Sequence, residues 1–474
     1  MTAMGDALAQ FTQAHPAQSG ILPLSDGRDA FAARVFLVRG ARRSLDVQYY
    51  IWHDDVTGTL MLEELRQAAE RGVRVRLLLD DNGIRDLDAT LAALDSHPLI
   101  EVRLFNPFSI RKPKALGYLT HFSRANRRMH NKSLTADEQA TIVGGRNMGD
   151  EYFDAGEGVL FADLDVLVVG EVVPKAAADF NRYWASPSAF EVEGLIPKAP
   201  ADAVVTFQTK AARLFHTEAA QRYLRSLAKA DFIVDWLAGR LEPAWANTAL
   251  VSDSPLKGLG LAKDQDLLFG KMMAQVGEPL KAFDLVSPYF VPTAQGVKAF
   301  AALAASGVKV RVLTNALEST DVAAVHAGYA KWRKPLLAAG VELYEMRRQT
   351  AGAKRRKGPG RFGSSGSSLH AKTFAVDGQK MFVGSFNFDP RSARLNTEMG
   401  FIIESAELAT TLSDKFSTQI PASAYRVQLD PQGRLYWLEH RDEGEVRHDV
   451  EPNTSWLKRA MVSLLAYLPI EWLL

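Results

Sequence analysis

The stretch RMHNKSLTAD at residues 128–137 returns as SLHAKTFAVD at residues 368–377. Both contain the pattern H-x-K-x-x-x-x-D, and the two histidines are 240 positions apart (370 − 130). Such a pattern arises by chance on the order of a few hundredths of a time in a chain of this composition. Two copies therefore indicate an internal duplication. The repeated residues are His130, Lys132 and Asp137, and His370, Lys372 and Asp377.

The similarity continues beyond each aspartate. Seven positions on, the chain reads Gly144-Gly145-Arg146-Asn147 in the first copy and Gly384-Ser385-Phe386-Asn387 in the second. A turn dipeptide, Asp377-Gly378, lies between two β-like runs in the second copy. Each copy is thus predicted to be a strand, a turn and a second strand.

Upstream of each motif, the same order of elements occurs. Apolar runs with strand-like patterning alternate with helix-like stretches, which is typical of an α/β sheet. Predicted strands in the first half are 44–52, 73–79 and 100–105, with a helix near 60–70. Their counterparts are strands at 283–291, 308–314 and 341–346, with a helix ending at 305.

The duplication predicts two similar α/β domains rather than a repeat array. Proline and small residues interrupt the periodicity at 186–203, so we place the boundary near 200. The predicted domains are residues 1–200, with the first motif, and residues 201–474, with the second motif and an apolar carboxyl-terminal segment.

Bulk composition excludes several kinds of chemistry. The chain has 474 residues, no cysteine and a formal net charge of +1. Disulfides, thiolate catalysis and cysteine-ligated zinc are excluded, and the balanced charge does not favour a polyanionic partner. No window reaches the roughly 18 apolar residues of a spanning helix. The chemistry is expected to depend on histidine, lysine and carboxylates.

The paired motifs predict a phosphodiester site. On a strand, His and Lys at i and i+2 face the same side. Two such pairs, converging across a pseudo-two-fold interface with the two asparagines, form a cationic site suited to a phosphate. One imidazole can attack phosphorus while the other protonates the leaving oxygen. The lysines stabilise the charge, so no metal and no cofactor are predicted.

These residues resemble the two HKD motifs of the phospholipase D superfamily. The resemblance covers nearly the whole chain and implies two α/β/α domains with one active site at their interface. It implies phosphate-binding roles for Asn147 and Asn387. In this superfamily a downstream acid orients each catalytic histidine, which implies Glu398 for His370 and Asp163, or alternatively Asp165, for His130.

Further segments resemble bacterial cardiolipin synthases of the C type. These segments are 127–154, 44–58, 249–258 and 468–471. The resemblance implies transfer of a phosphatidyl group, through a phosphatidyl-histidine, from a phospholipid such as phosphatidylethanolamine to phosphatidylglycerol. It also implies peripheral attachment to a bacterial inner membrane and a helper protein.

Other interpretations remain open at this level. Water could replace the acceptor, giving a hydrolytic phospholipase D, and the fold could serve as a lipid-binding module without catalysis. A nuclease is less favoured, because few aromatic residues accompany the basic runs at 111–114 and 354–357. The terminal residues 455–474 fit an interfacial helix or a packed one equally well. The pairs Asp54-Asp55 and Asp80-Asp81 fit capping better than metal binding.

The two motifs predict six catalytic residues, which are His130, Lys132, Asp137, His370, Lys372 and Asp377. Among them, Asp137 has a different expected task. Asp137 lies at the predicted turn, five residues beyond Lys132. We therefore expect it to brace the motif rather than to contact the phosphate.

Overall fold

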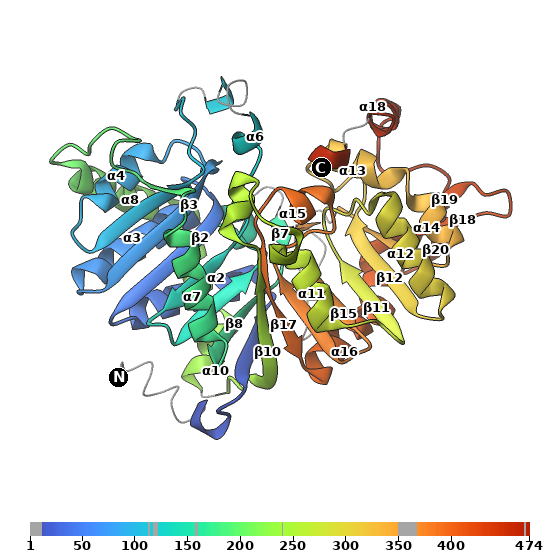
Figure 1. The fold of residues 1–474 in the computed structure, drawn as a ribbon, viewed down its shortest axis with the longest axis horizontal. Coiled ribbons are helices and arrows are strands. Elements are labelled where there is room, and N and C mark those ends of the chain that lie inside the picture. Colours follow the sequence, from blue (N-terminus) through green and yellow to red (C-terminus); the bar gives the residue numbers. More distant parts are fainter. Residues whose placement is uncertain are drawn as a thin grey trace.

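The computed structural model arranges the chain as two α/β halves that meet along one seam (Figure 1). It describes residues 12–111, 114–116, 122–156, 160–238, 240–348, 367–468 and 471–474. The basic run at 354–357 and Lys112 lie outside the described residues, as do residues 469–470 of the carboxyl-terminal segment.

The first half contains one mixed sheet. Its strands are β1 (Ser19–Leu24), β2 (Ser44–Trp52), β3 (Arg74–Ile84), β4 (Ile100–Phe105), β5 (Ser133–Ala136), β6 (Ala140–Gly144), β8 (Asp165–Gly170) and β9 (Ala189–Glu191). They lie in the order β9-β4-β3-β2-β5-β6-β8-β1. β2, β3 and β4 are parallel, as the β-α-β pattern predicts, and the remaining neighbours are antiparallel.

The second half repeats this sheet strand for strand. Its strands are β10 (Ala244–Ser252), β11 (Ala282–Val286), β12 (Lys309–Asn315), β13 (Glu342–Met346), β15 (Thr373–Val376), β16 (Lys380–Gly384), β17 (Met399–Glu404) and β18 (Ala424–Leu429). The order is β18-β13-β12-β11-β15-β16-β17-β10. A hairpin of β19 (Leu435–Arg441) and β20 (Gly444–His448) extends it beyond β18.

The seam joins two equivalent strands. β1 and β10 each end their own sheet, and they pair antiparallel, with Gly20 opposite Trp245. Equivalent strands that pair in this way are related by a two-fold axis. A second link is the parallel pair of β7 (Leu160–Ala162) with β14 (Ser367–Leu369). The chain therefore forms one continuous structure with internal pseudo-symmetry.

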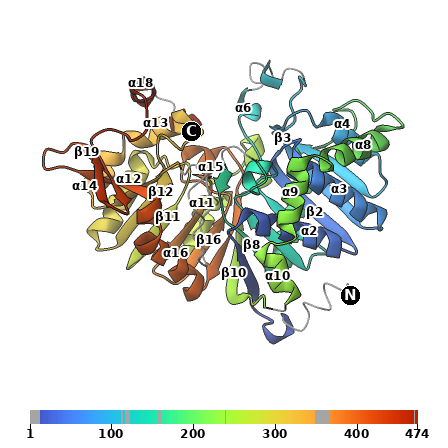
Figure 2. The same ribbon diagram turned by 180° about the vertical axis from the view of Figure 1, so that it is seen from behind.

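Helices cover both faces of each sheet. In the first half α2 (Gly27–Gly40), α3 (Val56–Glu70) and α4 (Asp88–Asp95) cover one face, and α7 (Val173–Trp184) covers the other. The second half has α11 (Leu268–Val276), α12 (Thr293–Ala305) and α14 (Arg333–Ala338) opposite α16 (Ala406–Thr418). Figure 1 shows α7, α11 and α12 in front, whereas Figure 2 shows α2, α3 and α16 in front. The two-fold relation explains this exchange of faces.

Further helices complete the fold. They are α6 (Phe122–Ala125), α8 (Ala203–Phe215), α9 (Glu218–Leu227), α10 (Asp231–Leu237), α13 (Ala323–Ala330), α15 (Pro390–Arg394), α17 (Ile420–Ser423) and α18 (Trp456–Ala466). The 3-10 turns are η1 (Lys114–Leu116), η2 (Asp150–Tyr152), η3 (Pro255–Leu259), η4 (Asp264–Asp266) and η5 (Glu471–Leu473). Within the part of the chain that the structure describes, no helix has the length and apolarity to cross a membrane.

The helices α8, α9 and α10 follow the predicted domain boundary near 200 but pack on the first half. Phe207, Tyr223 and Phe232 belong to the hydrophobic core of the first half. The packing therefore favours a boundary between α10 and β10. One further core is shared by both halves, because Val166 and Val173 pack in the same cluster as Phe401 and Leu412.

Glycines and prolines set element ends that position the site. Gly72 and Gly307 have φ of 93° and 89° and turn the chain from α3 into β3 and from α12 into β12. The predicted strand 283–291 ends earlier, at Val286. Pro288 follows and has no N–H to donate to a ladder, which explains the shorter strand.

Candidate active site

Both motifs lie at the carboxyl-end edge of the parallel strands and are held there by the opposite half. The His130 backbone N–H donates to the Thr397 carbonyl oxygen at 2.9 Å. The His370 backbone N–H donates to the Ala162 carbonyl oxygen at 2.7 Å. The strands β5 and β15 begin only after Lys132 and Lys372, so the His-x-Lys segments precede the strands rather than forming part of them.

The acids that orient the histidines are crossed between the halves. His130 Nδ1 lies 2.8 Å from a Glu398 carboxylate oxygen. His370 Nδ1 lies 2.5 Å from an Asp163 carboxylate oxygen. The predicted pairing within each half, Asp163 with His130 and Glu398 with His370, is therefore wrong. Asp165, the alternative partner, accepts hydrogen bonds from Arg34 and Arg146 instead.

The crossed pairing bears on the chemistry of the rings. A neutral histidine whose Nδ1–H donates to a carboxylate has its lone pair on Nε2. Each ring is buried and contacts an aromatic side chain: the ring centroids of Tyr50 and His130 are 5.0 Å apart, and those of Tyr152 and His370 are 5.2 Å apart. Each histidine therefore belongs to one half of the chain, whereas the acid that orients its ring belongs to the other half.

Each acid has its own support. The Ser385 hydroxyl donates to Glu398 at 2.5 Å, and the Glu398 backbone N–H donates to Asp253 at 2.9 Å. The equivalent of Ser385 in the first half is Gly145, where a Cβ would lie 2.1 Å from an Asp163 carboxylate oxygen. The Gly/Ser difference in the repeated signature therefore matches the difference between the two acids.

Both lysines are buried beside the histidines. Lys132 Nζ donates to the His130 carbonyl oxygen at 2.5 Å, and Lys372 Nζ donates to the His370 carbonyl oxygen. Lys372 Nζ also lies 3.0 Å from His370 Nδ1. The positive charges of Lys372 and His370 also act on the His130 ring, so the two His-Lys pairs lie near each other in one buried region.

Burial dominates the protonation of the site. It lowers the pKa of His130 well below its usual value, and the positive charges of Lys132 and Lys372 lower it further. Burial also lowers the pKa of His370, which Asp163 partly offsets. Burial raises the pKa of Glu398 to about 7, against the opposing effect of Lys132. Neutral imidazoles at neutral pH follow from these shifts.

The two predicted phosphate-binding asparagines have different surroundings. Asn147 accepts the Ile51 backbone N–H at 3.1 Å and donates one amide hydrogen to the Tyr152 hydroxyl at 2.9 Å. Asn387 Oδ1 is buried and has no hydrogen-bond partner among the residues that the structure describes.

Asp137 and Asp377 lie away from the histidines. The Asp137 carboxylate accepts the backbone N–H groups of Arg42, Arg43 and Ser44 at 3.0, 2.7 and 2.9 Å. Asp377 accepts those of residues 280, 281 and 282 at the same three distances. Four strand residues, about 13 Å, separate each aspartate from the site edge. The expectation that Asp137 braces the motif agrees with this geometry, and neither aspartate is placed to act on substrate.

We expect Asp137→Asn to lower the free energy of unfolding by about 1–3 kcal/mol, because a buried, charged acceptor of three backbone N–H groups becomes a weaker one. Denaturant unfolding measures this change. Glu138→Gln, at the exposed neighbouring position, is the matched control and should change stability little. A fully stable but inactive Asp137→Asn protein would contradict the bracing role.

The acidic pairs near the strand ends have structural partners. Asp55 caps α3 through the Gly58 N–H, as predicted, and Asp80 accepts the Met129 N–H at 2.7 Å. Within the described residues, His53, Asp55 and Glu151 are the one group of three ligand-type side chains close enough for a cation. His53 and Glu151 already form an ion pair at 3.2 Å.

Sequence reasoning missed the residues that support the site from outside the motifs. Tyr50, Tyr152 and Asp253 lie outside the two His-Lys-Asp motifs and the Gly/Asn signatures that follow them. Asp253 accepts hydrogen bonds from the Glu398 N–H and from Lys257 Nζ, and both contacts are buried. Its position directly after β10, a seam strand, was the available signal.

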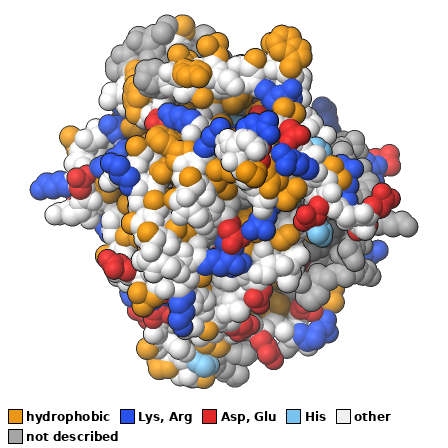
Figure 3. Space-filling view, turned by 90° about the vertical axis from the view of Figure 1, so that its right-hand side faces the viewer, with side chains coloured by type: hydrophobic (Ala, Val, Ile, Leu, Met, Phe, Trp, Pro, Cys, Tyr) orange, Lys and Arg blue, Asp and Glu red, His pale blue; other side chains and the backbone are white. Residues whose placement is uncertain are grey.

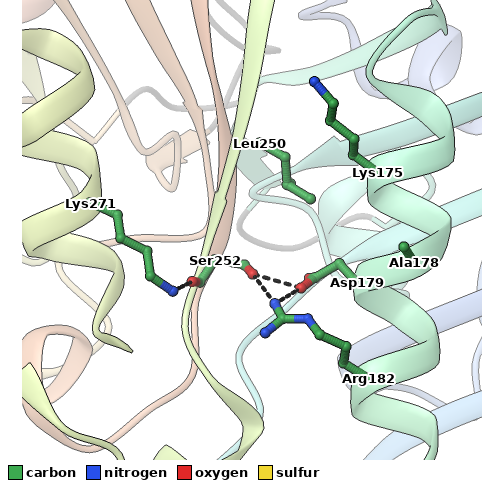
Figure 4. A pocket seen from close by; sticks show the side chains of 7 residues that line it. All are labelled: Lys175, Ala178, Asp179, Arg182, Leu250, Ser252 and Lys271. Carbon is green, nitrogen blue, oxygen red and sulfur yellow. Dashed lines mark hydrogen bonds and ion pairs between the residues drawn. The ribbon is translucent and has the colours of Figure 1, made fainter. Parts of the chain in front are cut away.

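A separate hollow lies at the seam between α7, β10 and α11 (Figure 4). Its volume is ≈ 280 Å³. Its polar groups bond to one another: Ser252 donates to Asp179, Arg182 contacts both, and Lys271 donates to the Ser252 carbonyl oxygen. It contains none of the motif residues, so it is distinct from the histidine site.

A duplicated α/β sheet with one His-Lys pair from each half defines the phospholipase D-like class. The sequence pattern of the family described as cardiolipin synthase, PLD-like domain, matches residues 37–184 and 272–420, once in each half. The chain belongs to this family.

Comparison with individual proteins also shows similarity to this family. Cardiolipin synthase C of Escherichia coli (strain K12) is 48% identical over 475 residues, which cover 100% of both chains. An uncharacterized protein of Helicobacter pylori (strain ATCC 700392 / 26695) is 33% identical over 99% of this chain and 92% of its own. Among solved structures, phosphatidylserine synthase of Haemophilus influenzae Rd KW20 matches with a TM-score of 0.60 at 13% identity, covering 99% of this chain and 100% of its own, and so shares the fold.

Proposed function

We propose that this protein is a cardiolipin synthase-type phosphatidyltransferase. It moves a phosphatidyl group from a donor phospholipid to the free hydroxyl of phosphatidylglycerol. Phosphatidylethanolamine is the donor that we favour. The observation that carries the proposal is the crossed pairing of His130 with Glu398 and His370 with Asp163, because it fixes two imidazoles for phosphodiester exchange.

In the first step, Nε2 of one neutral histidine attacks the phosphorus of the donor. The bond from phosphorus to the headgroup oxygen breaks, and the second histidine, protonated in the substrate complex, donates a proton to that oxygen. The negative charge of the bound phosphodiester favours this protonation, which the lysines and burial oppose in the free site. The products are a phosphatidyl-histidine and a free alcohol, which is ethanolamine for the favoured donor.

In the second step, the acceptor hydroxyl attacks the phosphatidyl-histidine. The second histidine, now neutral, takes the hydroxyl proton, and the phosphorus–nitrogen bond breaks. Cardiolipin leaves, and both rings return to their starting states. Lys132 and Lys372 stabilise the oxygens of phosphorus in both transition states. We assign the nucleophile to His130 and the acid–base role to His370 by resemblance to the superfamily.

We expect the purified protein to form cardiolipin from vesicles that contain both phosphatidylethanolamine and phosphatidylglycerol, and to release one ethanolamine for each cardiolipin. Leaving out phosphatidylglycerol removes the hydroxyl acceptor, so cardiolipin should disappear. Lipid chromatography with quantitative ethanolamine detection measures both products.

Phosphatidic acid without cardiolipin would instead establish the second candidate, a hydrolytic phospholipase D, in which water attacks the same intermediate. His440→Gln, on the exposed β19–β20 hairpin, is a control that should retain full synthase activity.

The substrates place the protein at a membrane. We propose peripheral attachment to the bacterial inner membrane, with a helper protein as a further partner and no nucleic acid. This proposal rests on the lipid substrates and on the similarity to a cardiolipin synthase.

A further inference from the structure

The carboxyl-terminal helix α18 presents an apolar face that no described residue covers. Its opposite side packs on the second half, where Val462 is buried against Ala327 of α13 and against Leu317, which precedes α13. The outward side and the turn after it are exposed, with Trp456 at 73%, Leu464 at 68% and Trp472 at 60%. The exposed apolar residues are Trp456, Leu457, Met461, Leu464, Leu468 and Trp472. A helix that is apolar on nearly all sides is normally covered on all of them.

The carboxyl-terminal segment is anchored beside the candidate active site. Arg391 lies four residues beyond Asn387, and its backbone N–H donates to the Leu474 carbonyl oxygen at 2.7 Å. Its guanidinium donates to Asn126 oxygens at 2.9 and 2.8 Å, four residues before His130. Lys458 Nζ holds α18 to the Leu317 carbonyl oxygen at 2.6 Å. The exposed face is therefore fixed relative to both motifs.

The first half carries a second apolar projection on the same edge. Leu116 in η1 and Phe122 in α6 are 44% and 46% exposed. Lys114, also in η1, donates to the Asp81 and Ile84 carbonyl oxygens, near the end of β3. Figure 1 shows α6 and α18 rising from the upper edge on either side of α15 and the carboxyl terminus. Figure 3 shows hydrophobic side chains along this edge, with Lys and Arg side chains below them.

We infer that α18, Leu468 and Trp472, together with η1 and α6, form the surface by which the protein docks on a lipid bilayer. A bilayer contacts both projections at once, because they rise from one edge. Tryptophan is favoured at membrane interfaces, where its ring is partly apolar and its N–H stays hydrated. This inference deepens the proposed function, since phospholipid substrates would reach the histidines from the membrane on that edge.

The test compares vesicle binding by the full chain and two variants. In Trp456→Ser/Leu457→Ser/Leu464→Ser, binding to phosphatidylethanolamine/phosphatidylglycerol vesicles should fall at least about tenfold, because apolar area no longer leaves water. Leu280→Ser is the matched control: Leu280 is 76% exposed but precedes β11, at the opposite edge of the sheet. Vesicle co-sedimentation measures binding. Unchanged binding by the triple variant, or no vesicle binding by the wild-type protein, would overturn the inference.

A second measurement does not depend on lost binding. Because the chain has no cysteine, Leu464→Cys and Leu280→Cys each offer a single thiol for an environment-sensitive fluorophore. Vesicles should shift the emission of the label at 464 to shorter wavelength and leave that at 280 unchanged. Equal responses at both positions would contradict docking through α18. The same result is expected if a helper protein, and not the bilayer, covers this face.

Activity separates the docking surface from the catalytic chemistry. On short-chain phospholipids dissolved as monomers, the triple variant should retain wild-type transfer, while on vesicles its rate should fall with its binding. Loss on both substrates would assign α18 to the site itself and overturn the docking role. If the wild-type protein makes no cardiolipin from either substrate, the proposed function fails, whereas the fluorescence result still decides the docking surface.

Discussion

Replacing His130 with Gln is expected to lower the rate of phosphatidyl transfer by at least about 10⁴-fold, because the proposed nucleophile and its covalent route are removed. His370→Gln should cause a loss of similar size with natural donors, since the leaving alcohol then departs without a proton. Steady-state formation of cardiolipin by each variant measures these losses.

A donor with a nitrophenol leaving group separates the two histidines, because this group departs without help from an acid. With it, His370→Gln should release about one equivalent of nitrophenol per enzyme and then stall, leaving a phosphatidyl group on His130. His130→Gln should show no burst. A burst from His130→Gln and none from His370→Gln would exchange the two roles.

Glu398→Gln is expected to lower the rate at least about 10³-fold, although Glu398 touches only the far side of the His130 ring. The amide no longer fixes the tautomer that leaves the Nε2 lone pair free. In the nitrophenol assay the loss should appear in the burst itself, which reports attack by His130. A slow second phase with a normal burst would assign Glu398 to His370, as spacing along the chain suggests.

The same variant should be more stable than the wild-type protein at high pH. The pKa of Glu398 rises from 4.5 to about 7 on folding, because the buried carboxylate is costly to ionise. The folded state therefore binds more protons between these values, and this stabilisation, present below pH 4.5, is lost as the pH rises through 7. At pH 8, Glu398→Gln should gain at most about 3 kcal/mol over the wild type, and at pH 4.5 much less.

Thermal unfolding at several pH values measures this difference. Glu404→Gln, at the exposed end of the strand β17 that follows Glu398, is the control and should change stability little. An equal change at pH 4.5 and pH 8 would mean that Glu398 is ionised in the folded protein across this range.

Hydrophobic periodicity and turn residues in the sequence predicted most of the strands and helices. The strand at 44–52 has the predicted bounds, and the paired motif strands follow from hydrophobic alternation and one turn. What the patterns could not give was the packing of α8, α9 and α10 on the first half. Proline and small residues at 186–203 resemble a linker, but the apolar side chains of Phe207 and Tyr223 fill the first core.

The sequence predicts candidate residues for the site, but it does not predict which of them contact one another. Motif spacing identifies His130, Lys132, His370 and Lys372 because the two copies share it. The assignment of each acid to a histidine depends on the seam, where residues more than two hundred positions apart meet. Spacing along the chain does not show which residues meet across the seam. The assignment of each histidine to the acid that follows it in the sequence was therefore wrong.

The crossed pairing gives the two catalytic histidines different acids as partners, Glu398 for His130 and Asp163 for His370. In a dimer of identical subunits, symmetry would give both histidines the same acid and the same support. A single chain removes that constraint, and here one ring meets glutamate with Ser385 while the other meets aspartate beside Gly145. In a single chain the two histidines can therefore take different roles, in agreement with the proposal that His130 attacks phosphorus and His370 transfers the proton.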